Sequence, residues 1–332
     1  MSARARPSGK VTQRDVARAA GVSHQSVSFI LNGRDHLFKP ETVAAVRRVA
    51  EELGYRRSAA ARSMRAGAIG SMALVLLHHR TASTVPPRLL DGLCAELEAT
   101  SRSLVVERWQ AERLTEDQDL PRQLREVASD GLVINWTQAL PEPAMRRIAA
   151  ARIPHVLLNN PAPWHAVRPD DFAAARAATA ELIAAGHRRI AYADWLHEPD
   201  KIFAGSDHYS IHDRWRGYAE VMTAAGLAPR ALLHERVIME EERRAPPLDW
   251  LRGPDAPTAL VSYSDYGVAA ALTTVPDLAV ASFGDGGPDI DGLPVRRWQV
   301  PLAAIARAAV AAIDRQIEHP GEKLPAVLVG YR

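Results

Sequence analysis

The chain has 332 residues, of which 47% are hydrophobic and 24% are charged. These values are typical of folded proteins and exclude a mainly disordered or fibrous chain. Domains usually have about 100–200 residues, so the length predicts two or three of them. The single cysteine, Cys94, excludes an internal disulfide framework and a multi-cysteine zinc site, and it fits a reducing compartment.

The distribution of charge divides the chain. Residues 1–67 contain 13 Lys and Arg against 5 Asp and Glu, a net charge of +8, whereas residues 68–332 contain 28 against 34, a net charge of −6. A basic N-terminal part favours a polyanionic partner, and a solvated basic tail is the alternative. No apolar run approaches the roughly 18 residues of a membrane span, and no signal-peptide core follows the N-terminus. We therefore expect a soluble, cytoplasmic protein without a membrane partner.

The basic part contains the pattern of three short helices. Apolar residues at helical spacing predict a helix after Thr12 and another after Ser23, with a turn at Gly21 between them. Pro40 starts a third predicted helix, which ends at Gly54. Two short helices joined by a tight glycine-containing turn are typical of a helix-turn-helix. A generic helical bundle with a basic face is the alternative.

Three strings within this part, VTQRDVARAAGVSHQSVSFILNG, PETVAAVRRVAEELGY and AARSMRAG, resemble the headpiece of the lactose-repressor (LacI/GalR) family of bacterial transcription regulators. The resemblance implies an all-α helix-turn-helix headpiece at residues 1–57 and a hinge helix at residues 58–67. It also implies an effector-binding and dimerisation domain at residues 68–332.

The resemblance also assigns roles in DNA binding. His24, Gln25 and Phe29 take the base-reading positions of a recognition helix that enters the major groove. Gln25 suits a bidentate contact with adenine, whereas Phe29 stands where many members carry a polar or basic reader. We therefore expect Phe29 either to contact a thymine methyl or to contribute little to base recognition. Phosphate contacts, with helix capping as the alternative role, are expected from Thr12, Ser23, Ser26, Ser28 and Asn32.

The linker is rich in alanine and arginine but too short to form a stable helix alone. In the family this segment folds on the operator and inserts an apolar side chain into the minor groove. Met64 takes that position, where members usually carry leucine. Arg57 and Arg62 are expected beside phosphates.

From Ile69 onward, short apolar runs alternate with helical stretches, which predicts parallel sheets flanked by helices. We expect an α/β body of two lobes that resembles the family's periplasmic-binding-protein-like effector domain, with a single larger Rossmann-like domain as the alternative. The expected lobes are residues 68–167 with 299–324, and residues 168–298 with 325–332. The body contains no dinucleotide fingerprint, P-loop, GxSxG or HExxH motif, so we expect no enzymatic activity, cofactor or metal.

Ligands in such a fold lie at the carboxyl ends of the strands, between the lobes. The resemblance places Asn135, Asn159, Arg214, Ser264 and Asp265 in the effector site. The amides suit hydroxyl groups and Arg214 suits vicinal hydroxyls or a carboxylate, with a surface ion pair as its alternative.

One departure from the family falls in this site. Members usually carry an aspartate where this chain has Gly284. Either Asp285 substitutes for it after a one-residue shift, or the effector is not an ordinary sugar.

One headpiece reads too few base pairs for genomic specificity, so a dimer on a pseudopalindromic double-stranded DNA operator is expected. No leucine heptad follows the last predicted strand, which favours a homodimer. The sequence thus predicts a transcription repressor controlled by a small sugar-like or nucleoside-like effector. A solute-binding receptor and a carbohydrate-processing protein share the two-lobe fold and are the alternatives.

Overall fold

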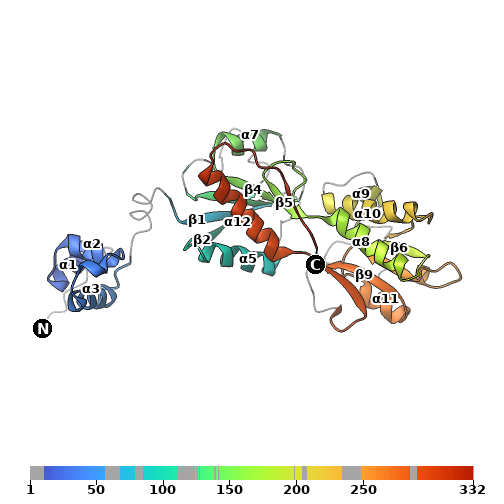
Figure 1. The fold of residues 1–332 in the computed structure, drawn as a ribbon, viewed down its shortest axis with the longest axis horizontal. Coiled ribbons are helices and arrows are strands. Elements are labelled where there is room, and N and C mark those ends of the chain that lie inside the picture. The colour runs from blue at the N-terminus through green and yellow to red at the C-terminus, as the bar shows by residue number, and fades with distance from the viewer. Residues whose placement is uncertain are drawn as a thin grey trace. The chain divides into compact units, whose positions relative to one another are not determined.

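The structure is a computed structural model with two compact units, residues 1–69 and 70–332 (Figure 1). It describes residues 11–56, 68–78, 85–110, 124, 126, 128–137, 140, 142–197, 199–203, 208–233, 248–284 and 290–331.

The first unit is a bundle of short helices. Its elements are α1 (Gln13–Ala20), α2 (His24–Leu31), the 3-10 turn η1 (Asp35–Leu37) and α3 (Pro40–Glu52). Thr12 begins α1 with a capping box, in which its N–H donates to the Asp15 carboxylate at 3.0 Å and its hydroxyl accepts from the Asp15 N–H. Gly21 ends α1 at φ 67°, a left-handed conformation that glycine adopts without strain. Val16, Val27 and Val46 join the three helices in one core. The predicted helix-turn-helix is confirmed.

The second unit contains two parallel sheets. The first has the strand order β11-β5-β4-β3-β1-β2. Its strands are β1 (Ser71–His78), β2 (Ser103–Gln110), β3 (Gly131–Asn135), β4 (His155–Leu158), β5 (Ala166–Pro169) and β11 (Val327–Val329). Its helices are α5 (Pro87–Glu98), α7 (Glu142–Ala150) and α12 (Leu302–Glu318). Alternate residues of β1 point to opposite faces, so that Leu74 packs with α5 and α12 whereas Val75 packs with α7.

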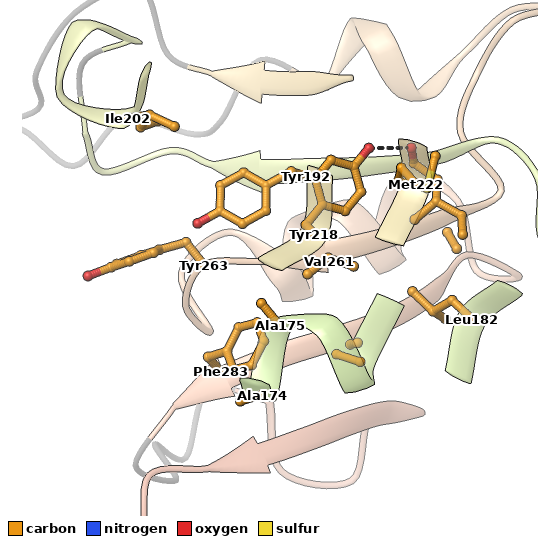
Figure 2. Packing of buried hydrophobic residues seen from close by; sticks show 14 of the residues in the cluster. Ala174, Ala175, Leu182, Tyr192, Ile202, Tyr218, Met222, Val261, Tyr263 and Phe283 are labelled. Atoms are coloured by element: carbon orange, nitrogen blue, oxygen red, sulfur yellow. Dashed lines mark hydrogen bonds between the residues drawn. The ribbon is translucent and has the colours of Figure 1, made fainter. Parts of the chain in front are cut away.

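The second sheet has the strand order β10-β9-β8-β6-β7. Its strands are β6 (Ile190–Asp194), β7 (Ala231–Leu233), β8 (Ala259–Ser262), β9 (Ala279–Gly284) and β10 (Val295–Gln299). Its helices are α8 (Asp171–Ala184), α9 (Pro199–Phe203), α10 (Tyr209–Ala224), α11 (Val268–Thr274) and the 3-10 turn η4 (Asp249–Leu251). Tyr192, Tyr218 and Phe283 lie in the cluster beneath α8 and α10, which Figure 2 shows, and α11 covers the other face. The predicted two-lobe α/β body is confirmed.

The strand pairing corrects one expectation about the lobes. Residues 325–332 were expected in the second lobe, but β11 pairs in parallel with β5 at the edge of the first sheet. An added strand satisfies the backbone groups that β5 would otherwise expose along that edge. Only after β11 does the chain reach the second lobe, where Tyr331 packs against the hydrophobic core. The other domain boundaries stay predictions.

Two helices of the second lobe approach each other closely at a glycine. A Cβ on Gly217 of α10 would clash with the carbonyl oxygen of Phe172 in α8 and lie 3.0 Å from the Cβ of Ala175. Because that oxygen belongs to the backbone, it has little freedom to move away. Gly217 is therefore required by packing, although glycine disfavours a helix.

Gly217→Ala is expected to lower the free energy of unfolding by about 1–3 kcal/mol, because overpacking outweighs the helix propensity of alanine. Chemical denaturation measures this change. Gly92→Ala in α5 is the comparison, since the added methyl group there would first meet the side-chain methyl of Ala306, at 2.9 Å, and we expect a smaller loss. An unchanged or increased stability of Gly217→Ala would contradict the packing argument.

Candidate DNA-reading helix and effector site

The helix α2 presents one face to the headpiece core and the other to solvent. Val27, Ile30 and Leu31 are buried against α1 and α3. His24 and Gln25 are exposed, and neither side chain hydrogen-bonds to another residue of the described headpiece. Their donors and acceptors are therefore available to a partner, as base reading in a groove requires.

The predicted phosphate donors lie at the ends of these helices. The Ser23 hydroxyl accepts from the Ser26 N–H at 3.0 Å and lies 2.8 Å from the Ser26 hydroxyl. At the other end of α2, the Asn32 amide donates to the Ser28 carbonyl at 2.5 Å and to its hydroxyl at 3.2 Å. Thr12, Ser23 and Asn32 thus have the capping role that the sequence left as the alternative. Phosphate binding by this group stays a prediction.

Phe29 differs from the other predicted base readers because it is half-buried. The centroid of the Phe29 ring lies 6.4 Å from the centroid of the Phe38 ring. The Cζ atom of Arg34 lies 5.6 Å from the Phe29 centroid. The ring therefore contacts its own domain on two sides. Its predicted contact with a thymine methyl is not tested by this geometry.

Four predicted site residues lie outside the described residues. These are Arg57, Arg62 and Met64 of the linker, and Asp285 after β9. The expected hinge helix at residues 58–67 also lies outside them.

In the first lobe, the structure brings together two predicted effector ligands. Asn135 ends β3, and Asn159 follows the neighbouring strand β4, so both lie at the carboxyl edge of the sheet. The Asn159 amide donates to the Asn135 side-chain oxygen at 3.0 Å. Asn159 has φ 52°, a conformation that asparagine tolerates better than most residues. Two amides at one edge offer both donors and acceptors to a polar ligand.

In the second lobe, Arg214 of α10 is buried in a polar network. Its Nε donates to Asp171 at 2.6 Å, one Nη donates to the Tyr263 carbonyl, and the other donates to the Tyr331 hydroxyl at 2.8 Å. The Tyr331 hydroxyl in turn donates to Asp171 at 2.7 Å. The guanidinium also lies over the rings of Tyr263 and Phe283, at 4.6 and 4.9 Å. Arg214 is thus not a surface residue, and each of its three nitrogens already serves the protein.

The network around Arg214 favours the charged form of its guanidinium. Burial alone would lower the pKa of Arg214, but the adjacent Asp171 carboxylate and nearby tyrosines outweigh it, so the net pKa is raised. Sequence reasoning missed Asp171 and Tyr331. One signal was available for Asp171, because the chain has two consecutive aspartates at the start of α8. Asp170 caps the helix through the Ala173 N–H at 3.0 Å, which leaves Asp171 to point inward.

Asp265 occupies the space next to Gly284. Its carboxylate accepts a hydrogen bond from the Ser282 hydroxyl at 2.5 Å, and a Cβ built on Gly284 would clash with the same carboxylate. The space that a side chain at position 284 would need is therefore filled by Asp265. Ser264 precedes it, and its hydroxyl accepts from the Tyr266 N–H at 3.3 Å.

A second polar chain, which sequence reasoning also missed, lies near Arg214. The Ser210 hydroxyl is 2.8 Å from Nδ1 of His208 and 3.0 Å from the Tyr263 hydroxyl. Burial lowers the pKa of His208 to about 4, so its ring is neutral at pH 7. Nearby, His197 contacts Asp194, whose carboxylate is completely buried at the end of β6. The second lobe therefore presents several hydrogen-bonding side chains at the carboxyl ends of its strands.

Among the residues that the structure describes, no group of His, Cys, Asp and Glu has the arrangement of a metal site. Within the same residues, no helix is long and apolar enough to cross a membrane.

Two family models match the chain. The model described as bacterial regulatory proteins, lacI family, matches residues 12–58, and a periplasmic binding protein-like domain matches residues 179–332. Among curated proteins, the maltose regulon regulatory protein MalI of Escherichia coli K12 is 32% identical over 55% of this chain and 53% of MalI. The transcriptional regulator CelR of Thermobifida fusca is 26% identical over 95% of this chain and 80% of CelR. The match to MalI thus spans about half the length of that relative.

Solved structures show the same fold. A lac repressor dimer bound to operator and the anti-inducer ONPF has a TM-score of 0.72 at 18% identity, covering 97% of both chains. A CelR–cellobiose complex has a TM-score of 0.58 at 23% identity, covering 97% of this chain and 98% of that one.

A helix-turn-helix headpiece on a two-lobe, periplasmic-binding-protein-like body defines a class of bacterial regulators. In this chain, residues 12–58 belong to the lacI family of bacterial regulatory proteins, and residues 179–332 belong to the periplasmic binding protein-like domains.

Asp171→Asn is expected to lower the free energy of unfolding by about 3–5 kcal/mol, because it leaves the buried Arg214 without its counter-ion. Urea denaturation at pH 7 measures the loss. Asp213→Asn is the matched control. Asp213 pairs with Arg168 at 2.8 Å in a more exposed place, so its loss should lower the free energy of unfolding by less. Equal and small losses of stability in both variants would show that the buried pair of Arg214 and Asp171 stabilises the fold no more than the exposed pair does.

Proposed function

We propose that the chain is a sequence-specific transcription repressor that binds a pseudopalindromic operator as a homodimer under the control of a small effector. The observation that carries this proposal is the exposed face of α2, a helix capped by Ser23, where the side chains of His24 and Gln25 make no hydrogen bond to any other described residue. The net charge of +8 over residues 1–67 supports attraction to DNA phosphates.

The effector that we propose is a sugar or a sugar-like molecule. The paired amides of Asn135 and Asn159 suit hydroxyl groups, and Asp265 adds a carboxylate acceptor in the second lobe. The buried counter-ion of Arg214 argues against recognition of an acidic group by that side chain. Structural similarity to a CelR–cellobiose complex supports the same class of ligand.

Dimerisation has support from an edge of the first sheet. Val105 and Val106 of the edge strand β2 are 40% and 52% exposed. They point to opposite faces of the sheet, so the edge strand offers a partner one apolar side chain on each face. The similar lac repressor structure is that of a dimer bound to operator. A homodimer also supplies two headpieces for the two half-sites of an operator.

Control by the effector follows from linkage. A ligand that contacts both lobes stabilises one arrangement of the lobes over another. If the two arrangements bind the operator with different affinities, the ligand changes operator binding. Arg168 of β5, in the first lobe, makes two contacts with α10 of the second lobe: an ion pair with Asp213 at 2.8 Å, and a cation–π contact with the Tyr209 ring at 4.5 Å. Such contacts are suited to transmit a change in lobe arrangement.

The proposal includes no enzymatic activity, since the similar curated proteins are transcription regulators. A DNA operator as partner places the protein in the cytoplasm, at the nucleoid when it is bound. The alternatives of a solute-binding receptor and a carbohydrate-processing protein leave the headpiece without a role.

The DNA-binding proposal is tested by selecting sites for the full chain from a random duplex library. We expect a palindromic consensus and an affinity that falls steeply with salt. Gln25→Ala should weaken consensus binding by about 1–3 kcal/mol while nonspecific affinity stays unchanged, because a base contact and not a phosphate contact is lost. Equal loss of both affinities would contradict base reading by Gln25, and the absence of any consensus would refute the function.

The effector proposal is tested by a thermal-shift screen of mono- and disaccharides, nucleosides and sugar phosphates, since a ligand stabilises the folded state by RT ln(1 + [L]/Kd). We expect a sugar to raise the melting temperature. Asp265→Asn should reduce that shift, because the carboxylate acceptor becomes a neutral amide of the same shape. Asp277→Asn in an exposed turn is the control. A full shift in Asp265→Asn would remove Asp265 from the site.

A further inference from the structure

The C-terminal end of α2 determines where the chain places Arg34, the residue after Gly33. Gly33 has φ 82°, and its N–H donates to the Ile30 carbonyl at 3.4 Å, while the Arg34 N–H donates to the Phe29 carbonyl at 3.0 Å. This pair of bonds is the Schellman motif, in which the residue after the glycine packs against the residue five positions earlier. The sequence Asn32-Gly33-Arg34 therefore directs Arg34 back toward Phe29.

The side chains of these two residues make the expected contact. The guanidinium carbon of Arg34 lies 5.6 Å from the centroid of the Phe29 ring, which packs on its other partner, Phe38, at 6.4 Å. A cation–π contact of this kind uses the charge of the guanidinium and none of its five N–H donors. The donors of Arg34 are thus held in place and still available.

Arg34 differs from Arg47 and Arg48 of α3 in its charge partners. Arg47 pairs with Asp35 at 2.5 Å, and Arg48 pairs with Glu52 at 2.8 Å. The side chain of Arg34, in contrast, is exposed and makes no ion pair with any residue of the described headpiece. Its positive charge is therefore not neutralised by an ion pair with any residue of the headpiece that the structure describes.

The position of Arg34 relative to the reading face follows from helix geometry. Gln25 and Phe29 are four residues apart on α2 and lie on the same face. The Phe29 ring offers no donor or acceptor to a base edge, but the guanidinium beside it extends that face with a planar set of donors. Guanine presents two acceptors, O6 and N7, that match such a fork.

We propose that Arg34 reads a guanine in each operator half-site and that Phe29 is a positioning residue that holds its guanidinium at the major groove. This inference rests on the proposed operator binding. The sequence assigned base reading to Phe29 and no role to Arg34, whereas the structure makes the two residues one unit.

The test compares binding sites selected from a random duplex library by the full chain and by Arg34→Lys. Lysine keeps the positive charge but lacks the fork that contacts O6 and N7 together. We expect one guanine in each half-site whose preference falls about tenfold in Arg34→Lys, while the other positions keep theirs. Arg48→Lys, on α3 and already paired with Glu52, is the matched control and should select the unchanged consensus.

A second variant tests the positioning role. Phe29→Leu keeps an apolar side chain but removes the ring, so preference at the same guanine should fall. Because both residues act through one contact, combining Phe29→Leu with Arg34→Lys should add little to the loss from Arg34→Lys alone. Melting curves establish that each variant remains folded.

The outcomes separate this inference from the function on which it rests. An Arg34→Lys consensus identical to that of the unmodified chain overturns the inference, whether overall affinity stays constant or falls uniformly as for a phosphate contact. If the unmodified chain selects no consensus, operator binding itself is refuted. A loss confined to one guanine per half-site supports the proposal.

Discussion

A charged guanidinium inside the second lobe is the constraint around which its surroundings are arranged. Removing Arg214 from water is costly, and the Asp171 carboxylate at 2.6 Å, the Tyr263 carbonyl and the Tyr331 hydroxyl together offset that cost. These partners come from α8, from the end of β8 and from the segment after β11. The ion pair therefore fixes how two helices, a strand end and the last part of the chain meet where effector contacts are predicted.

The sequence predicted the elements of the headpiece in detail, because local signals decide them. Thr12 and Gly21 act within one or two turns of where they stand, so caps and periodicity identify the helices. The body was predictable as alternating strands and helices for the same reason. The partners of Arg214 were not, since Asp171 is 43 residues away and Tyr331 is 117 residues away along the chain. The placement of β11 also depends on such long-range pairing, which no local pattern specifies.

The effect of having glycine at position 284 depends on the residues that surround it. Read alone, the glycine is a missing carboxylate in the predicted effector site. In the structure, the Asp265 carboxylate lies where a side chain at position 284 would begin, and Ser282 donates a hydrogen bond to it. A carboxylate is thus present in nearly the same place, but it comes from the loop after β8. Packing and hydrogen bonding between adjacent strand ends supply what the position itself lacks.

The hydrogen bonds of Tyr331 give the C-terminal segment an architectural role. Its hydroxyl is shared between Arg214 and Asp171, and its ring meets Phe283 edge to face at 5.7 Å. These contacts anchor the chain in the second lobe at Tyr331. Removal of Tyr331 would take a hydrogen-bond partner from both Arg214 and Asp171 and would expose this charged pair to solvent, so the integrity of these last residues bears on the stability of the second lobe.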